Sequence, residues 1–169
     1  MKLRIIAVLT AVASVSACQT VQHATPSGRP EVTINAPIDD VKATYVGTLT
    51  NFGYSMIRDT NYQIVMEKPV DNLMANVLLS SQYDPTVEAR ITATFLNMGR
   101  QTRVTTDMGV VRNGGSAFEA VAPLNGSRDS VGVQSLLNEI KSELEAGKAP
   151  GQVVAIASQR DIGVRAGVR

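Results

Sequence analysis

The clearest strand pattern in the chain runs through residues 87–112, where apolar and polar side chains alternate. From Val87 to Phe95 every second residue is apolar or small, and a strand places such residues on one face. Met98 and Gly99 follow at a position suited to a tight turn, with Gly99 supplying a positive φ. The segment is therefore predicted to form a long antiparallel hairpin with one buried face, which requires other elements to cover that face.

The expected turn also predicts which residues lie opposite each other. With two turn residues, Phe95 pairs with Thr102 on the apolar face, and Arg90 pairs with Asp107 on the polar face. A shift of one residue would expose the apolar set, so the alternation favours this register. The simplest expectation for Arg90 is thus a cross-strand ion pair with Asp107.

The rest of the chain supplies helices and further strands. Apolar residues three and four apart predict one helix over residues 37–51, with Asp39 and Asp40 at its positive end, and another over residues 130–147. Shorter patterns predict strands at 31–35, 54–59 and 62–68. The apolar residues from Val70 to Leu78 predict a short helix that ends before Pro85. Together they predict an α+β class: two layers, an antiparallel sheet of four or five strands, and two or three helices packed on one face.

The first 17 residues have the pattern of a secretory signal peptide. Lys2 and Arg4 precede an apolar run from Ile5 to Ala13, and small residues follow. About nine residues are too few to cross a bilayer core, which needs roughly 20. We therefore expect residues 1–17 to direct export rather than to anchor the chain.

The only cysteine, Cys18, stands at the end of this segment. The sequence VSAC, from Val15 to Cys18, resembles the lipobox of bacterial lipoproteins, although Val15 replaces the more usual leucine. The resemblance implies lipidation of Cys18, and Gln19 in place of aspartate implies the periplasmic face of the outer membrane. Cleavage after Ala17 by ordinary signal peptidase, leaving a free thiol or an intermolecular disulfide, is the alternative.

Two segments outside the predicted core are polar or basic. Residues 18–30 contain two prolines and a glycine without apolar periodicity, so we expect a flexible tether in which His23 is a solvated residue. Residues 31–147 form the expected α+β periplasmic domain. Residues 148–169 are basic and are predicted to be a mostly disordered tail, with a short added strand at 153–157 as the alternative.

Composition argues against several classes of function. Loss of Lys2 and Arg4 leaves 14 of the 16 basic residues against 15 acidic ones, and a chain so near neutrality has no electrostatic reason to bind nucleic acid. With one cysteine and one histidine, nucleophilic catalysis and a zinc site lack their usual residues. We therefore expect no enzyme activity, no catalytic residue, no bound metal and no cofactor.

The candidate functional surface in the sequence is the pair Arg90 and Arg103, which share the polar face of the hairpin. Arginine suits anionic partners, although pairing within the sheet is the simpler explanation. The order of elements is similar to that of small proteobacterial lipoproteins and, loosely, to helix-over-sheet domains of outer-membrane assembly lipoproteins. The expected function is a non-enzymatic interaction or assembly module of the cell envelope, anchored through lipid on Cys18, with an envelope protein as its partner. The alternative is a periplasmic small-ligand carrier.

Overall fold

The computed structural model describes residues 20–70 and 87–167. Cys18, the signal segment and all but the first residue of the short helix expected to end before Pro85 therefore lie outside the described residues. The elements in chain order are β1 (Glu31–Ile34), α1 (Ile38–Asn51), β2 (Ser55–Asp59), β3 (Gln63–Pro69), β4 (Val87–Asn97), β5 (Thr102–Arg112), β6 (Ala120–Pro123), α3 (Arg128–Glu145), α4 (Pro150–Ala157) and α5 (Ile162–Arg165).

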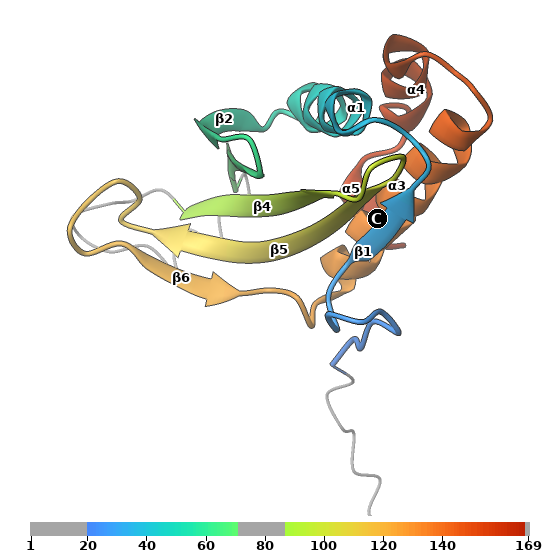
Figure 1. Ribbon diagram of the computed structural model, residues 1–169. Helices are drawn as coiled ribbons and strands as arrows, with labels where there is room; N and C mark the ends of the chain where they lie inside the picture. The colour runs from blue at the N-terminus through green and yellow to red at the C-terminus, as the bar shows by residue number, and fades with distance from the viewer. Residues whose placement is uncertain (1–19, 71–86, 168–169) are drawn as a thin grey trace, which may run out of the picture.

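The strands form one antiparallel sheet in the order β1-β5-β4-β3-β2, and β6 pairs with the far half of β5. The predicted α+β class is confirmed, with six strands rather than four or five and with four helices among the described residues. Figure 1 shows the helices gathered over one end of the sheet, whereas the β5–β6 loop extends beyond them.

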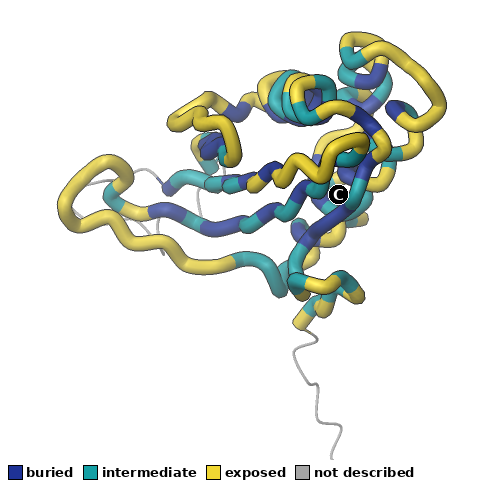
Figure 2. Tube along the Cα trace, in the orientation of Figure 1, coloured by how far each residue is buried: buried dark blue, intermediate teal, exposed yellow. Residues whose placement is uncertain are grey.

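The core lies between the helices and one face of the sheet. Alternate residues of the central strands, such as Ile91, Phe95 and Val104, are fully buried against residues of α1 and α3, such as Leu49 and Ile140. Figure 2 shows buried positions along the middle of β4 and β5 and exposed ones along β2 and β6. Burial of these side chains is the main favourable term in folding.

Helix α1 begins and ends where the sequence predicts. Pro37 precedes the helix, two acidic residues follow in its first turn, and Gly53 adopts a φ of 87° just after its end. Two buried threonines, Thr44 and Thr48, donate their hydroxyl hydrogens to the carbonyl oxygens four residues earlier. Their polar groups are thereby satisfied inside the core.

The predicted hairpin register is wrong by two residues. Phe95 lies opposite Val104 and Arg90 opposite Gly109, because the turn contains four residues, 98–101, rather than two. A shift of two keeps every side chain on its expected face, so the alternation alone does not distinguish the two registers. The expected cross-strand pair between Arg90 and Asp107 is consequently absent.

The prediction of a disordered tail is wrong for residues 150–165. Helix α4 packs on α1 and α3, and α5 packs on α3, burying Val153, Ala157 and Ile162. The side chain of Arg165 is fully buried, pairs with Glu139 of α3 and donates to the carbonyl oxygen of Ala157. These contacts order a segment whose local pattern is too short to predict a helix.

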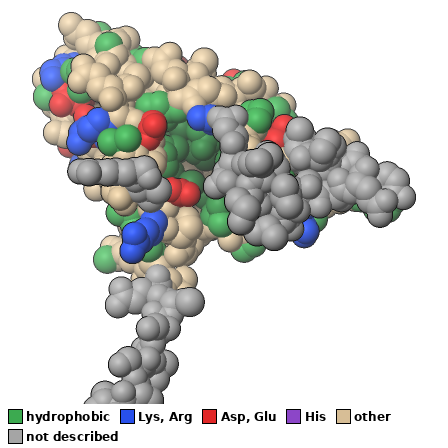
Figure 3. All heavy atoms as spheres, turned by 180° about the vertical axis from the view of Figure 1, so that it is seen from behind, with side chains coloured by type: hydrophobic (Ala, Val, Ile, Leu, Met, Phe, Trp, Pro, Cys, Tyr) green, Lys and Arg blue, Asp and Glu red, His purple; other side chains and the backbone are tan. Residues whose placement is uncertain are grey.

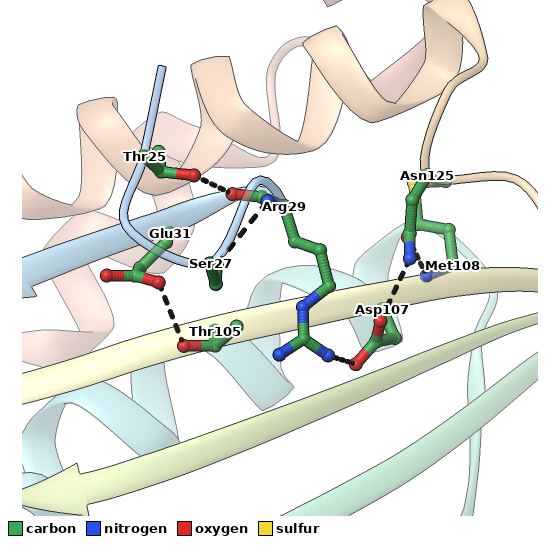
Figure 4. A network of polar contacts seen from close by, with 8 residues as sticks. All are labelled: Thr25, Ser27, Arg29, Glu31, Thr105, Asp107, Met108 and Asn125. Carbon is green, nitrogen blue, oxygen red and sulfur yellow. Dashed lines mark hydrogen bonds and ion pairs between the residues drawn. The ribbon is translucent and has the colours of Figure 1, made fainter. Parts of the chain in front are cut away.

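The expected flexible tether is also docked on the domain from Thr20 onward. Arg29 pairs with Asp107 at 2.5 Å, and Asn125 donates to the same carboxylate while accepting from the backbone N–H of Met108 (Figure 4). The backbone N–H of Val21 donates to the carbonyl oxygen of Gly126. The residues that hold this segment are far from it in the sequence. Its own polar composition contains no sign of these contacts and therefore predicted a free linker.

Candidate functional site

Arg90, the first residue of the surface predicted to bind an anionic partner, forms ion pairs with two carboxylates of the domain. Its guanidinium pairs with Glu67 at 2.5 Å and with Glu119 at 2.6 Å. Arg90 lowers the pKa of Glu119 to about 2, and the backbone N–H of Gly115 adds to the effect. Because Glu67 is only 6% exposed, Arg90 supplies the counter-ion that a buried carboxylate needs.

Arg103, the second residue of that surface, is also paired. Its Nε lies 2.8 Å from Oε1 of Glu31, whose side chain is almost completely buried. The hydrogen bond to Arg103 lowers the pKa of the Glu31 carboxyl. The structure therefore places both arginines on the polar sheet face, as predicted. Each forms ion pairs with carboxylates of the domain and is not free to bind an external anion.

His23 is not a solvated linker residue. Its Nε2 lies 2.8 Å from the hydroxyl oxygen of Ser130, and that hydroxyl donates to the carbonyl oxygen of Ser127. Ser130 is fully buried in the first turn of α3, so its oxygen is not accessible to a substrate. The contact attaches the segment before β1 to α3.

Acidification is expected to loosen this attachment. Burial lowers the pKa of His23 below its ordinary value of 6.5, opposed by a hydrogen bond to the backbone of Asn125. His23 therefore binds a proton more readily in the unfolded chain than in the folded chain. The contribution of neutral His23 to the stability of the fold is present above about pH 6.5 and is lost as the pH falls. Amide hydrogen exchange of residues 20–30 should accelerate between pH 7 and 5, relative to the intrinsic rate, and a His23→Gln variant should lack that step. Unchanged protection in the wild-type chain would contradict the prediction.

A cleft opens on the helix-covered side of the sheet, beside the end of α1 and the starts of α3 and α5. Its volume is about 230 Å³. Apolar side chains make up much of its wall, including Phe52, Met108, Leu124 and Ile162. Figure 3, viewed from behind, shows a hollow of hydrophobic side chains with acidic and basic side chains at its rim.

Arg90 also lines the cleft, but its guanidinium is already paired with Glu67 and Glu119. The other polar side chains of the cleft come from four parts of the chain. Tyr54 follows α1, Lys68 lies on β3, Asp129 is in the first turn of α3, and Asp161 precedes α5. Burial, followed by the negative charges of Asp129 and Asp161, raises the pKa of Tyr54 to about 12. The phenol therefore stays protonated at neutral pH and is able to donate or accept a hydrogen bond.

The edge of the sheet offers a second type of site. Strand β2 is the last strand of the described sheet, and all five of its residues are exposed. An irregularity in its pairing with β3 falls at Ile57, whose side chain is 56% exposed. Tyr62, in the turn between the two strands, is 66% exposed. An unpaired strand edge of this kind is able to accept another extended chain.

Metal binding has no obvious location in the part of the chain that the structure describes, which contains no group of three or more histidine, cysteine, aspartate or glutamate residues suited to a metal. Within residues 20–70 and 87–167, every helix is too short or too polar to span a bilayer. No protein-family model, curated protein or solved structure matched the chain. Inferences about function therefore depend on side-chain chemistry.

Sequence reasoning missed the polar residues of the cleft. It assigned no part in binding to Tyr54, Lys68, Asp129 or Asp161. The last of these lies in the segment predicted to be disordered. No motif links the four residues, because their proximity arises from packing of α3 on the sheet and of α5 on α3.

Proposed function

We propose that this chain is a non-enzymatic lipoprotein of the outer membrane whose periplasmic domain binds another envelope protein through β2. The supporting observation is that β2 ends the described sheet with every residue exposed. Backbone groups of such an edge bind an extended segment by strand addition, while exposed side chains such as Ile57 and Tyr62 add apolar contact.

The alternative, a small-ligand carrier, requires an apolar cavity of several hundred Å³. The cleft, at about 230 Å³ and with charged side chains in its wall, does not provide the large apolar cavity that enclosing an apolar cargo requires. An interaction module is therefore the better-supported proposal.

The proposed anchor would keep the domain close to the membrane. The described chain is docked from Thr20, whose methyl group lies against Gly126, and Thr20 is only two positions after Cys18. Two residues span at most about 7 Å. A lipid on Cys18 would thus hold the face around Gly126 near the bilayer surface.

The anchor is tested by intact mass of the chain purified from membranes of a diderm bacterium. We expect a mass that includes a diacylglyceryl group on Cys18, and a Cys18→Ala variant should lose the lipid and leave the membrane fraction. An unmodified wild-type chain would overturn the lipoprotein assignment.

The docking edge is tested by placing a photo-crosslinking amino acid at Ile57 in the full chain, expressed in a diderm bacterium. The matched control is Val164, which is 57% exposed against 56% for Ile57 but lies on α5. We expect a discrete adduct from Ile57 only, with the crosslink mapping by mass spectrometry to an extended segment of the partner. Adducts of equal yield from both positions, or none from Ile57, would contradict docking at β2.

A further inference from the structure

The hydroxyl of Tyr54 opens into the cleft and forms no hydrogen bond within the described chain. Tyr54 as a whole is only 8% exposed. The ring is packed among apolar side chains, whereas the hydroxyl oxygen keeps accessible surface on the cleft. The hydroxyl of Tyr54 is therefore an available contact for a molecule in the cleft.

Charges of both signs face the same cleft. Within the described chain, neither the carboxylates of Asp129 and Asp161 nor the ammonium of Lys68 forms an ion pair. One oxygen of Asp161 accepts from the backbone N–H of Val164, which leaves its second oxygen available. A cation alone would satisfy only the aspartates, and an anion alone only the lysine.

We propose that this cleft binds a small zwitterion with an apolar body, the chemistry of an apolar amino acid or a dipeptide. Its ammonium group donates to Asp129, Asp161 and the oxygen of Tyr54, and its carboxylate pairs with Lys68. The apolar body lies against Phe52 and Ile162. This site is separate from β2 and does not depend on strand addition or lipidation.

The size of the cleft limits the ligand. Its volume of about 230 Å³ lies just below the roughly 300–1,000 Å³ of typical ligand clefts. An amino acid such as leucine or methionine fits this space, whereas a phospholipid acyl chain or a long peptide does not. The cleft therefore suits recognition of a small molecule rather than transport of a lipid.

The first test is isothermal titration calorimetry of the purified chain with L-leucine, L-methionine and the dipeptide alanyl-leucine. N-acetyl-leucine lacks the ammonium group, and leucinamide lacks the carboxylate. We expect at least one zwitterion to bind and both modified leucines to bind about tenfold more weakly or worse than leucine, because each loses a charge-assisted contact. No binding of any zwitterion at 10 mM would overturn the proposal, as would equal binding of the modified leucines.

Variants then locate the site. Asp129→Asn and Lys68→Met should each weaken binding about tenfold, and Tyr54→Phe by a smaller factor. The matched control is Asp39→Asn, which also changes an acidic residue in the first turn of a helix but lies outside the cleft. Circular dichroism should show all four variants folded. Affinity unchanged in both Asp129→Asn and Lys68→Met would refute the assignment of the cleft.

Discussion

Replacing Phe95 by alanine is expected to lower the free energy of unfolding by about 3–5 kcal/mol. Phe95 is 1% exposed on β4 and meets the ring of Tyr45 edge to face, with centroids 6.2 Å apart. Its removal would leave a cavity between α1 and the centre of the sheet, and the strand pair with Val104 would limit collapse around it. Urea denaturation followed by circular dichroism measures the change.

Phe118 provides the matched control, because it is 81% exposed in the loop before β6. Phe118→Ala should change the free energy of unfolding by less than about 0.5 kcal/mol. Similar effects at the two positions would contradict the described core.

Gly132→Ala is expected to detach α5 from α3 and to lower the free energy of unfolding by about 3 kcal/mol. A Cβ at this position would lie 2.1 Å from the carbonyl oxygen of Ile162. The backbone at Ile162 cannot move aside as a flexible side chain can, so α3 and α5 must separate to accommodate the new methyl group. Limited proteolysis of residues 148–167 should become faster, and denaturation measures the loss of stability.

The control for this variant is Gly151→Ala, a glycine-to-alanine change in α4 where no atom lies within 4 Å of the new Cβ. Alanine favours helix over glycine by about 1 kcal/mol, so this variant should be as stable as the wild type or more so. If Gly132→Ala leaves both stability and proteolysis unchanged, α5 does not pack on α3 as described.

The Gly132 variant also bears on the cleft. Asp161 and Ile162 line it, and both lie at the start of α5. Detachment of α5 should therefore weaken binding of a zwitterion, whereas the edge strand β2 is unaffected. Crosslinking from Ile57 in the same variant would distinguish the two proposed sites.

Periodicity predicted the large elements well. The apolar stripes that predicted helices over 37–51 and 130–147 correspond to α1 and α3, and the alternation in 87–112 corresponds to β4 and β5. Each of these elements is long enough for its pattern to repeat several times. Strand β6 has only four residues, all exposed, so it carries no comparable pattern.

The C-terminal helices illustrate why short segments were predicted poorly. In α4, Val153, Val154 and Ile156 are β-branched, which favours a strand when the segment is considered alone. Pro150 suits the first turn of a helix, and Gly47 of α1 allows Val154 to approach closely. Tertiary contact thus outweighs the local preference.

The sequence by itself determined the class of fold, the two faces of the long hairpin and the faces of the two main helices, because side-chain periodicity carries that information. Only the tertiary structure decided the hairpin register, the docking of residues 20–30, the partners of Arg90 and Arg103, and the cleft around Tyr54. These features depend on contacts between residues distant in the sequence. Turn length and the packing of whole helices and strands determine such contacts. Neither can be predicted from a local sequence pattern.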